Sequence, residues 1–125
     1  MIGYTTVGTN DLAAAVSFYD QIFRSVDIHR LIDFGERGIA WGVSWDKPSF
    51  AVLTPYDGQP ARPGNGIMVA YRAPSIEAVH AAHKAGLANG GVDETDDGKP
   101  GPRPADSKSF YGAYLRDPTG NKIAI

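Results

Sequence analysis

The two halves of this chain resemble each other at a fixed offset of 64 residues, and this similarity constrains the fold most. Asp11 and Ser75 both stand directly before an apolar stripe, where a helix N-cap is expected. The same offset aligns Tyr4 with Met68 in the run before each helix. Similarity at a fixed spacing indicates an internal repeat, although two unrelated α+β halves can also match by chance.

The spacing of apolar residues predicts the same order of elements in both halves. In the first half, a strand is predicted at residues 2–8, a helix at 12–23, and three further strands at 26–34, 39–45 and 49–54. The second half repeats this order with a strand at 67–71, a helix that opens at Pro74-Ser75 and ends at Gly90-Gly91, a short or distorted strand within 92–106, and strands at 109–115 and 121–125. We therefore predict an α+β domain over residues 1–125, built from two βαβββ modules at about 1–58 and 64–125.

Two apolar stripes are predicted, a buried one on the second helix and one along a strand. Ile76, Val79, His83 and Leu87 form one side of the second helix. The strand at 39–45 alternates, with Ile39, Trp41, Val43 and Trp45 on one face.

Composition excludes several kinds of protein. Charged residues are 21% of the chain and the net charge is -2, which gives no electrostatic reason to expect a nucleic-acid partner. The absence of cysteine excludes disulfides, thiolate metal sites and a cysteine nucleophile. No apolar run is long enough to cross a membrane, and the first residues do not resemble a signal peptide, so we expect a cytoplasmic protein.

Motifs at both ends carry a resemblance to a known family. The opening residues 4–12, followed by Phe18-Tyr19, resemble the first strand and helix of the vicinal-oxygen-chelate superfamily, which includes glyoxalases, bleomycin-resistance proteins and extradiol dioxygenases. Residues 111–123, with Asp117-Pro118-Thr119-Gly120-Asn121, resemble its closing hairpin. Gly64-Asn65-Gly66 also resembles a glyoxalase-like bacterial subgroup. The resemblance implies a cup-shaped, eight-stranded mixed sheet, often completed by a homodimer.

The resemblance also implies four positions for a divalent metal. Metal-using members place His on the first strand and Glu on the fourth strand of each module. Here these positions hold Tyr4, Met68, Ala124 and, within one or two residues, Val52. One phenol beside a thioether and alkyl groups does not form a divalent-metal site. We therefore expect no metal and no cofactor.

Histidine and acidic side chains elsewhere in the chain offer alternative candidate sites. Glu77, His80 and His83 do not converge on one ion, because three-residue steps rotate around a helix. One packed and one exposed histidine is expected instead, and His29 is expected to face solvent. The acidic run of Asp93, Glu94, Asp96 and Asp97 is expected to be a solvated loop, although it can attract a cationic ligand.

The preferred hypothesis is a metal-free binder of a small organic molecule, acting as a homodimer. Its cup would be lined by Tyr4, Val52, Met68, Ala124, Trp41, Trp45, Phe50 and Tyr114. One alternative is an enzyme resembling a lactoylglutathione lyase, an isomerase or a dioxygenase. Another is a structural or regulatory homodimer without a ligand.

Overall fold

The computed structural model describes residues 1–125, except for the side chain of Asp96. The first module contains β1 (Tyr4–Gly8), α1 (Leu12–Phe23), β2 (His29–Asp33), β3 (Gly38–Gly42) and β4 (Ser49–Leu53), with a short 3₁₀ turn, η1 (Gly35–Arg37), between β2 and β3. The second contains β5 (Val69–Ala70), α2 (Ile76–Ala88), β6 (Val92–Asp93), η2 (Asp96–Gly98), β7 (Gly101–Pro102), β8 (Tyr111–Gly112), β9 (Tyr114–Arg116) and β10 (Lys122–Ala124). The α+β class is confirmed.

The two helices begin at equivalent places, which confirms the offset of 64 residues. Asp11 caps α1 by accepting a 2.9 Å hydrogen bond from the backbone N–H of Ala14. Ser75 caps α2 in the same way, accepting a 3.2 Å bond from Ala78. Each cap satisfies a backbone donor that has no partner within its helix.

Each module forms its own four-stranded sheet with the same topology. The strand orders are β1-β4-β3-β2 and β5-β10-β9-β6. In both, the first strand pairs in parallel with the last one, and the other neighbours are antiparallel. The repeat is therefore one of topology as well as of sequence pattern.

A single eight-stranded sheet is not formed by the described residues. The two four-stranded sheets are separate, and β7 and β8 make an additional two-stranded ribbon. The strand β5 pairs through only Val69 and Ala70, between a Gly-rich loop and Pro74. A strand this short, which already pairs with β10, has little ladder left to join the sheets.

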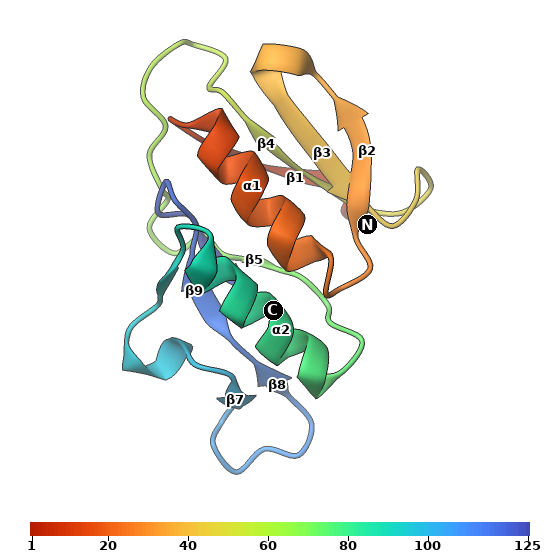
Figure 1. Ribbon diagram of the computed structural model, residues 1–125, viewed down its shortest axis with the longest axis vertical. Coiled ribbons are helices and arrows are strands. Elements are labelled where there is room, and N and C mark those ends of the chain that lie inside the picture. Colours follow the sequence, from red (N-terminus) through yellow and green to blue (C-terminus); the bar gives the residue numbers. More distant parts are fainter.

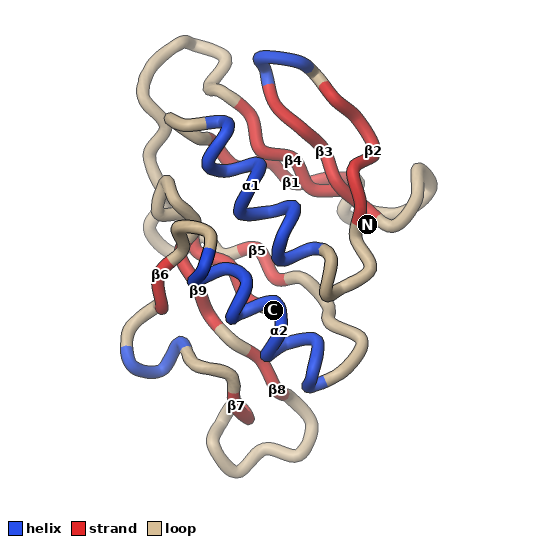
Figure 2. Tube along the Cα trace, viewed as in Figure 1, coloured by secondary structure: helices blue, strands red, loops and turns tan.

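Both helices cover the same side of the sheets. Figures 1 and 2 show α1 and α2 side by side, with the strands of the two modules behind them. The core lies between the helices and the sheets and combines Phe18, Tyr19 and Phe23 of α1 with residues from both modules, including Leu115 and Ile123. Burial of these side chains provides most of the driving force for folding.

Two predicted apolar stripes are only partly buried. On β3, Ile39 and Trp41 are buried, but the strand ends at Gly42, and Val43 and Trp45 are exposed near the following turn. On α2, Val79 and His83 are buried, whereas Ile76 and Leu87 are 50% and 41% exposed. The exposed members of the two stripes therefore lie beyond the end of β3 or in the first and last turns of α2.

The closing turn connects the two modules. Asp117 accepts hydrogen bonds of 2.9 Å at Oδ1 from the backbone N–H groups of Thr119 and Asn121. Its Oδ2 accepts a 2.8 Å bond from the Tyr19 hydroxyl of α1. Asn121 Nδ2 donates to Asp117 Oδ2 and to the Gly8 carbonyl, each at 2.9 Å. These bonds give the motif a structural role.

The helices α1 and α2 contain 12 and 13 residues. Within the described chain, no helix has the length and apolar character that crossing a bilayer requires.

Candidate functional site

The two faces of each sheet have different neighbours. In the first sheet, Val7, Val52 and Ile39 are in register and pack in the core under α1. Side chains alternate along a strand, so Thr6 and Ala51, one residue earlier, point to the other side. We call this other side the open face, because no helix of the described chain covers it. It carries Tyr4, Thr6, Ala51, Met68, Ala70, Tyr114, Lys122 and Ala124.

Three of the four positions implied for a metal lie on the open face. Tyr4 is 71% exposed, Met68 is 45% exposed, and Ala124 is 3% exposed between its neighbouring strands. Val52 is instead fully buried on the helix side.

The strand register identifies which residue of β4 corresponds to Ala124. Ala124 pairs with Ala70, and Ala51 pairs with Thr6, which is the residue 64 positions before Ala70. The equivalent residue is therefore Ala51, one position before Val52 and within the range expected from the sequence.

The donor set does not fit a divalent metal ion. Tyr4, Met68, Ala51 and Ala124 offer one phenol, one thioether and two methyl groups, whereas such ions prefer imidazole and carboxylate ligands. Within the described part of the chain, no group of three His, Asp or Glu side chains is arranged to hold a metal ion.

Besides Tyr4, the four other aromatic residues predicted to line the cup lie in three different environments. Trp41 and Phe50 are in the core beside α1, where Trp41 Nε1 donates a 2.9 Å bond to Asp20. Trp45 lies in the turn after β3 and is 72% exposed. Tyr114 is on the open face, in register with Ala124. The structure thus groups Tyr114 with Ala124 and Met68, but separates them from Trp41, Phe50 and Val52.

The histidines do not form a common site. His83 is 8% exposed, and its Nε2 is 2.6 Å from Asp93 Oδ1, which connects α2 to β6. His80 is exposed, and its Nε2 is 2.7 Å from the Tyr111 hydroxyl. His29 is exposed on β2. The expected pattern of one packed and one exposed histidine on α2 is confirmed.

The acidic run is divided among different partners. Asp93 faces His83, while Glu94 accepts two hydrogen bonds from the Arg116 guanidinium. The side chain of Asp96 lies outside the described residues. Asp93 therefore forms a hydrogen bond with a helix side chain, and Glu94 forms ion pairs with Arg116 and Lys122.

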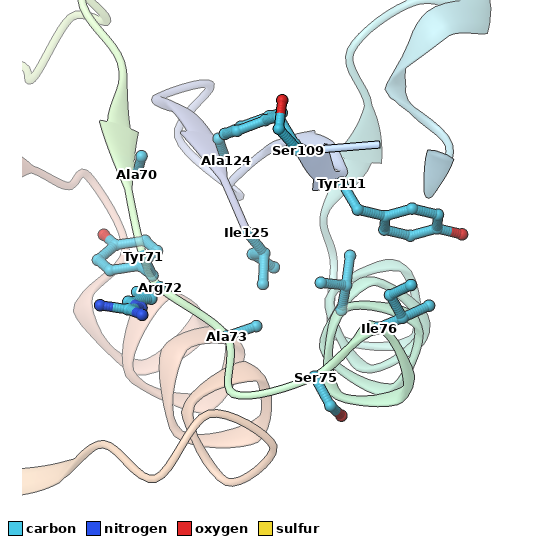
Figure 3. A pocket seen from close by; sticks show the side chains of 12 residues that line it. Ala70, Tyr71, Arg72, Ala73, Ser75, Ile76, Ser109, Tyr111, Ala124 and Ile125 are labelled. Carbon is cyan, nitrogen blue, oxygen red and sulfur yellow. The ribbon is translucent and has the colours of Figure 1, made fainter. Parts of the chain in front are cut away.

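A cavity of about 500 Å³ lies between β5, the end of β10, the first turn of α2 and the segment before β8. We call it the apolar cavity. Figure 3 shows Ala70 and Ala73 on one side, Ile76 and Tyr111 on the other, and Ile125 between them. Its lining residues are Ala70, Tyr71, Arg72, Ala73, Ser75, Ile76, Val79, Ser109, Phe110, Tyr111, Ala124 and Ile125.

The apolar cavity has few polar groups. Arg72, Ser75 and Ser109 contribute the charged and hydroxyl side chains, and Tyr111 extends toward His80. Of the eight predicted cup residues, only Ala124 lines it. Sequence reasoning did not identify Ile76 or Phe110 as lining residues. Their apolar character indicated packing in the core, whereas in the structure each is about half exposed and lines the cavity.

A second cavity, of about 570 Å³, lies on the open face of the second sheet. We call it the charged cavity. It is lined by Pro63, Gly64, Asn65, Gly66, Ile67, Met68, Glu94, Arg116 and Lys122. Arg116 forms two hydrogen bonds with Glu94 through Nε and Nη2 and a third, of 3.0 Å, with the Gly120 carbonyl. The hydrogen bonds from Arg116 to Glu94, together with nearby Lys122, lower the pKa of Glu94.

The whole sequence, residues 1–125, matches the family model for the glyoxalase/bleomycin resistance protein/dioxygenase superfamily. None of the curated proteins matches the chain.

Solved structures show the same fold. A glyoxalase/bleomycin resistance protein from Albidiferax ferrireducens T118 is 36% identical with a TM-score of 0.84, over 99% of this chain and 95% of that one. A glyoxalase-related enzyme from Fulvimarina pelagi is 20% identical with a TM-score of 0.69, over 100% and 86%. A lactoylglutathione lyase from Agrobacterium tumefaciens is 20% identical with a TM-score of 0.64, over 99% and 91%. This chain belongs to the glyoxalase/bleomycin resistance protein/dioxygenase superfamily.

Proposed function

We propose that this protein binds a small, mainly apolar organic molecule in the apolar cavity, without a divalent metal ion. The observation that carries the proposal is the cavity itself, which has about 500 Å³ of space beside Ala124. Pockets that bind small molecules usually have about 300–1,000 Å³, with apolar walls and a few polar groups.

The lining suggests which part of a ligand each wall would contact. Ile76, Phe110 and Ile125 provide apolar and aromatic surface for a flat or branched hydrocarbon group. Arg72 and Ser109 provide hydrogen-bond donors. Burial of the hydrocarbon group provides affinity, while the polar groups select its orientation.

The absence of a metal is proposed from side-chain chemistry. Tyr4, Met68, Ala51 and Ala124 stand at the positions that the family resemblance gives to metal ligands, and they do not form a suitable donor set. A metal-dependent lyase reaction would lack its ligands here, so binding is favoured over that alternative. Metal analysis of the purified protein is expected to find less than one tightly bound Ni, Zn, Fe or Mn ion per chain, and a stoichiometric ion would contradict this part of the proposal.

Calorimetric titration with 4-phenyl-1-butanol tests the cavity. The wild type is expected to bind this neutral probe, and Ala70→Trp is expected to abolish binding, because Ala70 is exposed and lines the cavity. Ala81→Trp is the matched control, since Ala81 is an exposed alanine of α2 that does not line the cavity. Lack of binding by the wild type, or equal binding by Ala70→Trp, would contradict the proposal.

We also propose a homodimer. Ile2, Tyr4, Val43 and Trp45 are 63%, 71%, 53% and 72% exposed. They lie at one end of the first sheet, where Gly42 and Tyr4 both pair with Ser49. Exposed apolar groups gathered in this way are typical of protein interfaces, so a second copy of the chain is the proposed partner.

A further inference from the structure

We propose that the ligand of the apolar cavity is a monoanionic organic acid, and that its carboxylate binds Lys122 in the charged cavity. This inference rests on the proposed function, because the hydrocarbon part of the acid would occupy the apolar cavity. It identifies the chemical class of the ligand and assigns Lys122 as the residue that selects it.

The two cavities lie next to each other along one pair of strands. Ala70 and Ala124 are in register on β5 and β10, and both line the apolar cavity. Two residues earlier, Met68 and Lys122 both line the charged cavity. Side chains two positions apart share a face and are separated by about 7 Å. Ala70 and Ala124 therefore place one wall of the apolar cavity on the open face, whereas Val79 and Ile125 line it from the helix side. A ligand that extends past Ala70 and Ala124 would reach the charged cavity.

The charged cavity has more positive than negative charge among its lining residues. Among the described residues that line it, Arg116 and Lys122 are the cations and Glu94 is the carboxylate. The Arg116 guanidinium is occupied by its bonds to Glu94 and to the Gly120 carbonyl. Glu94 is therefore neutralised mainly by Arg116, which leaves the charge of Lys122 in excess.

The Lys122 ammonium is held near Glu94 and Tyr114, but its hydrogen-bond donors are not all used. Its Nζ lies 3.5 Å from Glu94 Oε1, longer than the usual 2.7–3.2 Å of an N–H···O hydrogen bond. It also lies 5.7 Å from the centre of the Tyr114 ring, which holds the side chain over the open face. An ammonium group has three donors, so it can bind a carboxylate while keeping its contact with Glu94.

The balance of charge favours one negative charge on the ligand. A carboxylate matches the single excess cation and accepts hydrogen bonds from it. A dianionic phosphate would need a second free cation, but Arg116 is committed to Glu94. The adjacent Met68 and Ile67 provide apolar contact for the methylene groups next to the carboxylate.

Two probes of the same length distinguish the acid from its neutral counterpart. In calorimetric titrations at neutral pH, 4-phenylbutyrate is expected to bind the wild type about tenfold more tightly than 4-phenyl-1-butanol, because its carboxylate accepts a charge-assisted hydrogen bond from Lys122. Lys122→Met is expected to remove this preference, so that the two probes bind alike. Lys122→Arg is expected to retain most of it.

Lys84→Met is the matched control, because Lys84 is an exposed lysine of α2 outside both cavities. It removes the same charge and should preserve the preference for the acid.

Equal affinity of both probes for the wild type would overturn the inference while leaving the proposed function intact. An acid preference that survives in Lys122→Met, or disappears equally in Lys84→Met, would also overturn it. Failure of both probes to bind the wild type would overturn the proposed function as well. Circular dichroism of each variant confirms that it is folded.

Discussion

The Tyr19 hydroxyl donates a 2.8 Å hydrogen bond to Asp117 Oδ2, across 98 residues of sequence. Tyr19 belongs to the helix of the first module, and Asp117 opens the closing turn of the second. Both side chains are buried, with exposures of 0% and 3%. The bond therefore joins the two modules inside the core, and the same carboxylate organises the turn.

This contact predicts that Tyr19→Phe destabilises the protein. The substitution leaves a buried carboxylate with one donor fewer, and loss of a bond to a charged group costs about 1.5–3 kcal/mol. Tyr71→Phe is the control, because the buried Tyr71 hydroxyl has no hydrogen-bond partner among the described residues. Its removal is expected to be neutral or stabilising, by up to about 1 kcal/mol. Urea denaturation measures both free energies of unfolding, and equal destabilisation by the two variants would contradict the assignment.

The same tyrosines predict a loss of stability at high pH. Burial, together with nearby Asp117, raises the pKa of Tyr19 and of Tyr71 well above the usual value of about 10. The folded state thus holds these protons more tightly than the unfolded state. Stability from this source is fully present below about pH 10 and falls as the pH rises further, by up to about 1.4 kcal/mol per pH unit for each group.

Comparison with the double variant Tyr19→Phe/Tyr71→Phe isolates this effect from the titration of lysines. Its free energy of unfolding is expected to fall less steeply than that of the wild type between about pH 10 and pH 11. Identical slopes would show that the two phenols do not contribute.

The register of β4 predicts that a glutamate destabilises the protein much more at position 52 than at the neighbouring position 51. Val52→Glu places an unpaired carboxylate in the core under α1, where Val52 is fully buried, and is expected to cost more than about 4 kcal/mol. Ala51→Glu points to the open face, where the carboxylate can reach solvent, so a cost of about 1–3 kcal/mol from crowding is expected. Thermal unfolding followed by circular dichroism compares the two, and greater damage from Ala51→Glu would reverse the assignment of the faces.

The exposed residues at the end of the first sheet predict an effect on assembly. Trp45→Ser removes a side chain that is 72% exposed beside Val43, and it is expected to weaken the proposed dimer by at least tenfold. Tyr56→Ser is the control, because Tyr56 is 92% exposed but lies in the loop after β4, away from Val43 in sequence. Light scattering during size-exclusion chromatography reports the mass of each variant. A monomeric wild type would rule out the dimer.

The helices and the module order could be predicted from the sequence because their signals are local. The N-caps Asp11 and Ser75, the apolar stripe of α1 and the Pro-Thr-Gly turn act over a few residues. The second module was predicted less sharply, since residues 92–106 contain only short strands among turns. The weak apolar alternation of this segment corresponds to the short strands β6 and β7 in the structure.

The candidate site was harder to predict because it depends on which face of each sheet is covered. Alternation shows that Ala51 and Val52 point to opposite sides, but it does not show where α1 packs. Trp41 and Phe50 were expected in a cup, and the helix places them in the core instead. The apolar cavity also depends on the meeting of Ala124 with Ile76 and Phe110, which are separated in sequence.

The sequence by itself determined the duplicated βαβββ order, the helix boundaries and the chemistry of Tyr4, Met68 and Ala124, because these follow from residue type and local spacing. Only the tertiary structure decided that Ala51 rather than Val52 shares the open face with Ala124. It also decided that the Lys122 ammonium lies near Glu94, whose charge is already paired with Arg116. The reason is physical: a strand has two equivalent faces until a helix covers one of them, and the neighbours of a side chain are set by packing across distant segments.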